Sequence, residues 1–295
     1  MTPSVFEVLT GLEQGPVAGL MSVFAFILGS LVGSFLNVVI YRVPLGRSIV
    51  LPPSACTTCN TPLKWYYNLP VLSYFSLGGK CRYCGSSYSI RYAALEFFCG
   101  CFFYFSQQQF GFFSLAFLKT VILFSLCLCV FFIDLDHWII PDGLNLLGVL
   151  LGLAFSFAHP LSSLPWLEGS LGMRGASLVW SVVGAVVGVG FFWSIQVVGL
   201  ILVKQEAMGG GDVKFAALIG AFLGPVAAFW SFLGSFFLGA MFAVPLLLLR
   251  RGGGKDPIPF GTFMAVSAVF FQVVDYSVVM GYLDEFYSFI LPMDY

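Results

Sequence analysis

Residues 206–224 read EAMGGGDVKFAALIGAFLG, so three glycines and two charges stand directly before an apolar run that continues to Leu249. A segment of about 20 apolar residues is long enough to cross a bilayer. Ionisable groups at membrane depth are costly, and each one marks a candidate functional site. The stretch therefore predicts a membrane helix whose N-terminal end carries Asp212 and Lys214.

The whole chain has the composition of a membrane protein. It is 59% hydrophobic and 9% charged, with a mean hydropathy of +0.96, whereas soluble domains carry about 25% charged residues. The predicted fold is an all-α polytopic membrane protein with about eight transmembrane helices. The apolar segments lie near residues 18–40, 92–112, 115–133, 139–158, 176–203, 213–224, 226–249 and 260–281, and only FLGPVA separates the sixth from the seventh.

The basic residues predict the orientation in the membrane. With eight crossings and both termini outside, eleven of the thirteen Lys and Arg residues lie on the inner side, and only Lys119 and Arg174 lie outside. Basic loops face the cytoplasm. The N-terminal MTPSVFEVLTGLEQG has no basic region ahead of its apolar run, which argues against a cleaved signal peptide. We expect an inner-membrane protein whose functional side faces the cytoplasm.

One long polar segment, residues 41–91, stands between the first and second predicted helices, with six basic residues and no acidic one. It contains Cys56-x2-Cys59 and Cys81-x2-Cys84, separated by 21 residues, a spacing close to that of zinc ribbons. Disulfides are the alternative, but a cytoplasmic loop is kept reduced. The pattern favours a structural Zn²⁺ bound by four thiolates, which leave no open position for chemistry.

Acidic residues gather at the inner ends of the predicted helices. The stretch FFIDLDHWIIPDG carries Asp134, Asp136, His137 and Asp142. In the expected topology Asp134 and Asp212 lie at similar depth, although they are 78 positions apart in the sequence. Two carboxylates in a partly dry cleft share a proton, so one activates a water while the other protonates the leaving nitrogen.

Other catalytic signatures are missing from the membrane portion, which has neither a G-x-S-x-G elbow nor an H-E-x-x-H site. Asp134 and Asp212 are therefore the predicted catalytic pair. The glycines at 209–211 predict a loop that lets a substrate backbone approach, since glycine permits close contact and positive φ.

The neighbouring charges have several readings. Asp142 follows Pro141 and can help to cap the next helix. Lys214 can tune Asp212 or extend to the lipid phosphates. The roles of Asp136, Asp142, Lys214 and Asp275 stay open at the level of sequence.

Several motifs together resemble one family. Asp134 in DLDHWIIPD, with GGGDVK, resembles the two aspartate motifs of the prepilin peptidases, bacterial members of the GxGD intramembrane aspartic proteases. GSFLNVVIYRVP at 33–44, the paired C-x-x-C segment through LGGKCRYC, SIRYAALE at 89–96 and PIPFG at 257–261 resemble further landmarks of that family, in the same order. The resemblance spans residues from about 30 to about 265.

The resemblance implies a function for each part of the chain. Asp134 and Asp212 would be the catalytic acids of an endopeptidase that cuts the short basic leader from type IV prepilins or type II secretion pseudopilins at the cytoplasmic face of the bacterial inner membrane. Family members with the cysteine-bearing loop also methylate the new N-terminal amine with S-adenosylmethionine. The expected divisions are 1–40, the N-terminal segment and first helix; 41–91, the methyltransferase-associated loop; and 92–295, the peptidase domain.

The remaining expectations concern ligands and partners. No G-x-G-x-x-G fingerprint places the methyl donor, for which GSFLN and LGGKC are the candidate segments. The expected partners are pilin-like substrates and the lipid bilayer, without nucleic acid, and the sequence predicts no oligomeric state.

Two other function classes fit parts of the sequence. An ion- or proton-coupled transporter would use the intramembrane acids, but the cytoplasmic cysteine segment and the lack of an evident internal repeat argue against it. A zinc-ribbon scaffold that recruits partners to the membrane would leave the paired acids without a role.

Overall fold

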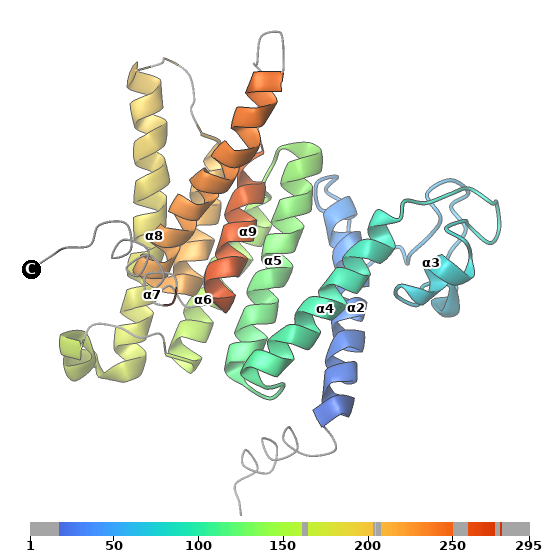
Figure 1. Cartoon of the computed structure of the whole chain (residues 1–295), viewed down its shortest axis with the longest axis horizontal. Coiled ribbons are helices and arrows are strands. Elements are labelled where there is room, and N and C mark those ends of the chain that lie inside the picture. Colours follow the sequence, from blue (N-terminus) through green and yellow to red (C-terminus); the bar gives the residue numbers. More distant parts are fainter. Residues whose placement is uncertain are drawn as a thin grey trace, which may run out of the picture. The chain divides into compact units, whose positions relative to one another are not determined.

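The computed structural model describes residues 18–160, 165–202, 204, 208–249, 259–274 and 278. Its regular elements are helices (Figure 1). Over these ranges the backbone forms no β-strand, only two isolated bridges, so the predicted all-α fold is confirmed. The helices are α2 (Ala18–Arg42), η1 (Trp65–Tyr67), α3 (Leu72–Ser76), α4 (Arg91–Phe110), α5 (Leu115–His137), α6 (Asp142–Ala158), α7 (Pro165–Leu202), α8 (Gly210–Leu249) and α9 (Phe260–Val273).

Several of these helices are apolar enough to cross a membrane, and the chain is a multi-pass membrane protein. By length and composition four described segments qualify: Gly19–Arg42, Leu115–His137, Pro165–Leu202 and Gly210–Pro245. The shorter apolar helices are α6 and α9. The predicted span at 92–112 is present as α4 but is not among the four, because an arginine, a glutamate and three glutamines lower its hydropathy.

The chain divides into two compact units, residues 1–125 and 126–295. In the first unit α2 packs closely on α4 through glycines. A Cβ atom at Gly33 would lie 2.9 Å from the Glu96 Cα, and one at Gly100 would lie 2.5 Å from the Ser30 hydroxyl. Small residues allow this approach between membrane helices. The packing keeps the start of α4 against the end of α2, where the polar insertion begins.

In the second unit, α8 consists of two helices that meet at a sharp turn. Gly224 has φ 75° and ψ 172°, and Pro225 follows it. The second helix folds back along α7, since a Cβ atom at Gly188 would lie 2.5 Å from the Ala216 carbonyl and 3.2 Å from the Phe232 ring. This turn confirms the break that FLGPVA predicts between the sixth and seventh apolar segments.

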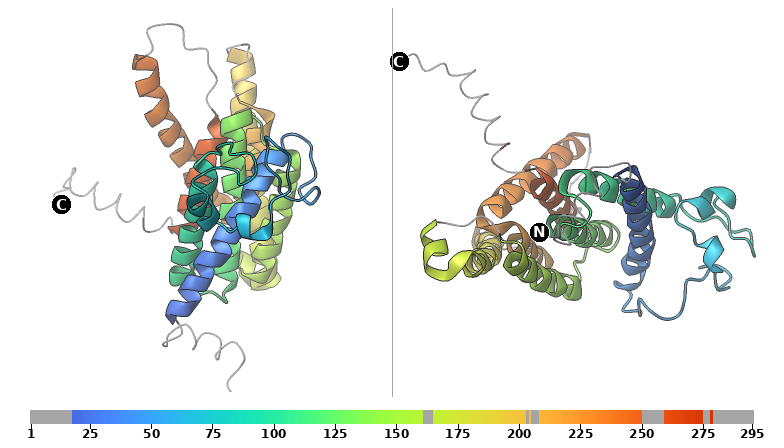
Figure 2. Two further views of the ribbon diagram at one scale, coloured as in Figure 1. Left: turned by 90° about the vertical axis from the view of Figure 1, so that its right-hand side faces the viewer. Right: turned by 90° about the horizontal axis from the view of Figure 1, so that it is seen from below.

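The helices α6, α7, α8 and α9 pack into one bundle (Figures 1 and 2). Glycine again sets the spacing, because Gly148 and Gly152 of α6 contact Leu218 and Ala221 of α8. This arrangement brings the end of α5 and the starts of α8 and α9 together. The end of α5 carries Asp134 and the start of α8 carries Asp212, the two predicted catalytic acids.

Candidate functional site

Asp134 lies near the end of α5, with only 6% of its surface exposed. Its Oδ2 atom accepts a hydrogen bond of 3.2 Å from the backbone N–H of Thr262. A Cβ atom at Gly261 would come within 2.9 Å of the same oxygen. The first turn of α9 therefore sits directly against the carboxylate, and a helix N-terminus favours a negative charge.

Asp212 lies in the first turn of α8. Its backbone N–H donates to the Gly209 carbonyl at 3.1 Å, and a Cβ atom at Gly211 would lie 3.2 Å from the Ile140 Cβ. The predicted loop at 209–211 is mostly wrong, because α8 begins at Gly210 and none of these glycines has a positive φ. Close packing at Gly211, rather than an unusual backbone, accounts for glycine there.

The structure brings the two predicted acids to one place. Asp134 and Asp212 belong to different helices of the second unit. Their carboxylates interact electrostatically, although 78 positions separate them in the sequence. Two like charges in a mostly buried setting are costly, so such a pair holds a single negative charge at the lowest free energy.

The charged neighbours of this pair are exposed. Lys214 donates to both carboxylate oxygens of Asp142, at 2.7 and 2.8 Å. This ion pair joins α8 to α6 and differs from both readings of Lys214 made from the sequence. Asp142 is the first residue of α6, whose N-cap makes no side-chain cap hydrogen bond. Asp136 and His137 are exposed at the end of α5, and Asp275 lies outside the described residues.

Asn145 of α6 is a polar residue that sequence reasoning missed. It is buried, with 3% of its surface exposed, and neither its amide nitrogen nor its amide oxygen has a hydrogen-bond partner among the described residues. One turn further along α6, Gly148 contacts Leu218, so Asn145 lies on the face toward the start of α8. The available signal was an amide in an apolar helix, three residues after Asp142.

Two turns of the same construction hold the four cysteines of the insertion. In each turn the first cysteine donates its N–H to the carbonyl five positions later. The residue four positions later has positive φ and donates back to that cysteine. These residues are Cys56, Asn60 and Thr61 in one turn, and Cys81, Gly85 and Ser86 in the other. Asn and Gly adopt positive φ at the least cost.

The geometry of the four sulfurs fits a metal. All four lie within 4.8 Å of one another, and the Cys56 and Cys84 sulfurs are 3.8 Å apart. Tetrahedral Zn²⁺ with Zn–S bonds of about 2.3 Å places its sulfurs about 3.8 Å apart. Backbone N–H groups of Cys59 and Thr58 donate to Cys56 and lower the pKa of its thiol to about 6. Thiolates are the form that binds metal.

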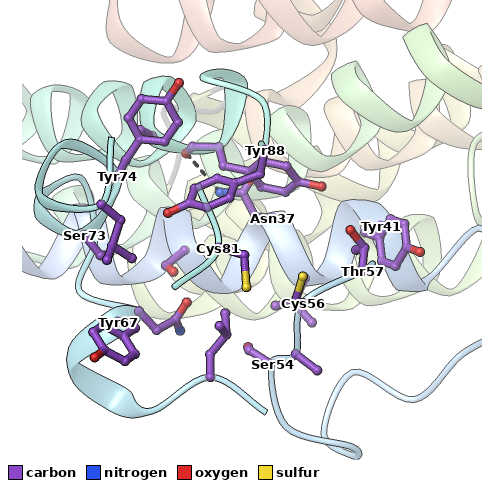
Figure 3. A pocket seen from close by; sticks show the side chains of 18 of the residues that line it. Asn37, Tyr41, Ser54, Cys56, Thr57, Tyr67, Ser73, Tyr74, Cys81 and Tyr88 are labelled. Atoms are coloured by element: carbon purple, nitrogen blue, oxygen red, sulfur yellow. Dashed lines mark hydrogen bonds between the residues drawn. The ribbon is translucent and has the colours of Figure 1, made fainter. Parts of the chain in front are cut away.

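A cavity of about 240 Å³ opens beside these turns in the first unit (Figure 3). Both segments considered for the methyl donor line it, GSFLN through Ser34 and Asn37 and LGGKC through Leu77 and Cys81. A second cavity of about 310 Å³ adjoins it and shares Ser34. The first unit therefore offers a ligand-sized space that includes no part of the aspartate pair.

Comparison with known proteins covers most of the chain. Two family models match: Bacterial Peptidase A24 N-terminal domain over residues 27–110 and Type IV leader peptidase family over residues 121–244. Three curated relatives share the name prepilin leader peptidase/N-methyltransferase. That of Myxococcus xanthus (strain DK1622) is 40% identical over 235 residues, which are 80% of this chain and 66% of the relative.

The other two relatives align over nearly their whole length. That of Stutzerimonas stutzeri is 32% identical over 290 residues, which cover 90% of this chain and 93% of the relative. That of Neisseria gonorrhoeae is 34% identical over 271 residues, which cover 82% of this chain and 87% of the relative. No solved structure matches the chain.

Proposed function

Because the chain belongs to the type IV leader peptidase family, we propose that it removes the leader from type IV prepilins or type II secretion pseudopilins and N-methylates the new N-terminus. Its relatives are named for both activities. Membership of a peptidase family favours this function over the transporter and the scaffold. We place the active side at the cytoplasmic face of the bacterial inner membrane, because eleven of thirteen basic residues fall there in the expected topology.

The two activities belong to different parts of the chain in this proposal. Residues 1–40 contribute the first membrane helix, residues 41–91 serve methyl transfer, and residues 92–295 form the peptidase. The four cysteine thiolates bind a structural Zn²⁺ that holds the insertion in shape. A closed set of four thiolates leaves this metal no open position at which to act as a catalyst.

One observation carries the peptidase assignment: the start of α9 rests on one acid of an interacting pair. The Thr262 N–H and the α9 N-terminus stabilise negative charge on Asp134. We therefore assign Asp134 as the general base and Asp212, which carries the shared proton, as the general acid. The GxGD aspartate and the first aspartate of D-x-D then have distinct roles.

The cleavage step follows from these roles. Asp134 removes a proton from a water, whose oxygen adds to the carbonyl carbon of the scissile peptide bond, while Asp212 donates its proton to the carbonyl oxygen. The tetrahedral intermediate collapses when Asp134 passes its proton to the leaving nitrogen and Asp212 recovers one from a hydroxyl. The C–N bond breaks, and the released amine is the new N-terminus.

Methylation acts on that amine. S-Adenosylmethionine supplies a methyl group bound to a positively charged sulfur: the amine nitrogen forms a bond to the methyl carbon, the carbon–sulfur bond breaks, and the sulfur keeps the electron pair. The nitrogen then releases a proton to water. The chain must hold donor and amine in line for this displacement.

Mass spectrometry of a pilin N-terminus tests both activities. A candidate prepilin co-expressed with the wild-type chain should lose its leader and gain one methyl group. Asp134→Asn and Asp212→Asn should each leave the leader in place. Asp136→Asn, two positions from Asp134 but exposed, is the matched control and should support normal processing. Normal processing by both active-site variants would refute the acid pair.

A further inference from the structure

The tyrosine-lined cavity of the first unit includes neither Asp134 nor Asp212 among its lining residues. We propose that it binds the adenosyl group of S-adenosylmethionine, with the methyl-bearing sulfur among its tyrosine rings. The proposal rests on the methyl-transfer half of the function above. It assigns to specific side chains a donor site that motifs in the sequence do not locate.

Three parts of the first unit form the walls of the cavity (Figure 3). They are the end of α2 with Asn37 and Tyr41, the insertion with Tyr67, Tyr74 and Tyr88, and the start of α4 with Tyr92 and Glu96. Small-molecule sites typically enclose roughly 300–1,000 Å³ and combine aromatic walls with a few polar groups. At about 240 Å³ this cavity suits the nucleoside part of a ligand whose remainder lies at the open side.

The aromatic lining is selective. The chain contains 34 phenylalanines and 12 tyrosines, yet among the described residues five tyrosines and no phenylalanine line this cavity. Neither apolar packing nor an acyl-chain ligand would require tyrosine in place of phenylalanine. Tyrosine offers a flat face for a purine and a hydroxyl for its polar edge, and aromatic faces attract a cation such as a sulfonium. The composition matches a ligand that is flat, polar and positively charged.

The rings are already held in position. Tyr74 and Tyr88 pack edge to face with centroids 5.5 Å apart. Tyr67 packs in the same way against Tyr66 at 4.5 Å and Tyr83 at 6.2 Å. A ligand that stacks on rings held in this way orders few side chains on binding, so less entropy is lost.

The polar groups complement the rest of an adenosylmethionine. The Asn37 amide nitrogen donates to the Tyr92 carbonyl at 3.1 Å, which fixes the amide and leaves its oxygen to accept from an adenine amine or a ribose hydroxyl. In the described part of the chain Glu96 supplies the one carboxylate of the lining, and its Oε2 accepts from the Val71 N–H at 2.7 Å. Arg82 at the exposed rim can pair with the methionine carboxylate.

The cavity also shares its wall with the cysteine cluster. Cys56 and Cys81 line the space, and each begins one of the two cysteine turns. The metal would therefore stabilise one side of the donor site without contacting the methyl group. The cysteine cluster and the cavity therefore depend on each other, since loss of the metal would remove a wall of the cavity.

Direct binding tests the proposal apart from catalysis. The full chain, purified in detergent, is titrated with methyl-tritiated S-adenosylmethionine and with S-adenosylhomocysteine. Tyr67→Ala and Tyr88→Ala should weaken binding of both by about 5- to 150-fold, the range for loss of one base–aromatic stack. Tyr104→Ala is the matched control, because its ring lies on α4 outside the lining and packs against Phe105 rather than a cavity tyrosine, and it should stay within about twofold. Zinc content and prepilin cleavage report whether each variant is folded.

The outcomes separate this inference from the function on which it rests. If the wild type binds the donor and the two cavity variants bind it equally well, the cavity assignment is wrong while methyl transfer stands. If the wild type cleaves prepilin but binds neither compound at millimolar concentration, the methyl-transfer half fails and the cavity assignment fails with it. Selective loss of binding in the two variants, with zinc and cleavage retained, confirms the site.

Discussion

The aspartate pair and the cysteine insertion are built in opposite ways. The acids come from helix ends that are far apart in the sequence, and Asp134 is brought against Thr262 by the packing of a buried bundle. The insertion is made of local turns, and most of its residues are partly or fully exposed. Charges act most strongly where water is excluded, whereas a soluble donor needs an open entrance. Each site therefore has the setting that its proposed chemistry requires.

This contrast predicts that the two activities can be separated. Asp212→Asn should lower cleavage by about 10³-fold or more, and Tyr67→Ala should lower methylation only. Mixed in one detergent solution with prepilin, the two variants should together yield a cleaved and methylated product, because each supplies what the other lacks. Mass spectrometry of the N-terminus is the readout. Cleaved but unmethylated product from the mixture would show that both sites must act within one molecule.

Loss of one thiolate should affect only the insertion. Structural Zn²⁺ contributes on the order of 10 kcal/mol to the folding of small zinc domains, so Cys56→Ser should release the metal and unfold the segment at 41–91. We expect donor binding to disappear and cleavage to persist within about tenfold. Metal analysis and limited proteolysis check this result. Cys101→Ser, outside the cluster, should retain the metal, and a metal-free variant that still binds the donor would contradict the shared wall.

Adding one methyl group at Gly261 should impair cleavage at the aspartate pair and leave donor binding unchanged. The Cβ atom in Gly261→Ala would lie 2.9 Å from Asp134 Oδ2 and 2.8 Å from the Ile140 side chain, so the start of α9 must move. A displacement of about 1 Å at a catalytic group lowers rates by about 10²-fold. Gly143→Ala has nothing within 4 Å and serves as the control. Kinetic assays should show the loss for Gly261→Ala with donor binding unchanged; unimpaired cleavage would remove α9 from the mechanism.

Asn145 tests whether the aspartate site extends onto α6. Asn145 has no hydrogen-bond partner among the described residues, and a buried amide in that state destabilises the fold, so Asn145→Ala should leave the melting temperature unchanged or raise it. If the amide instead holds the substrate or the attacking water, cleavage should fall by about tenfold, as expected for one lost hydrogen bond. Thermal unfolding and cleavage assays measured side by side distinguish the two. A lower melting temperature with a normal rate would indicate a structural role alone.

The smallest effect is expected at the exposed ion pair. Lys214 and Asp142 are 56% and 71% exposed at their side chains, and such pairs contribute about 0–1 kcal/mol. A double-mutant cycle with Lys214→Met and Asp142→Asn should give a coupling free energy within that range, and cleavage should stay within about twofold. A much larger loss in Lys214→Met alone would show that Lys214 acts on Asp212.

The sequence predicted the parts of both sites that local spacing encodes. The C-x2-C pairs, the two acids and the break at FLGPVA could be read directly, because a turn or a membrane boundary depends on adjacent residues. The partner of Asp134 could not, since Thr262 is 128 positions away and no local pattern specifies which helix end reaches it. The Lys214–Asp142 pair and the buried amide of Asn145 were missed for the same reason.

The donor cavity shows a different limit. Its two candidate segments were identified by resemblance, but the five tyrosines come from α2, the insertion and α4. They become a set only when the insertion folds against the two helices. The loop predicted at the three glycines failed because glycine has two uses, close packing and positive φ, and the letters alone do not distinguish them.

The turn at Gly224 has a consequence for how the chain crosses the membrane. Its φ of 75° and ψ of 172° define a conformation that essentially only glycine adopts and that costs other residues about 1–3 kcal/mol. If residues 210–249 formed one straight helix, α9 would begin on the opposite side of the membrane from Asp134. In the proposed orientation this run therefore crosses the membrane twice, and a substitution that straightens the turn would place the start of α9 on the side away from Asp134.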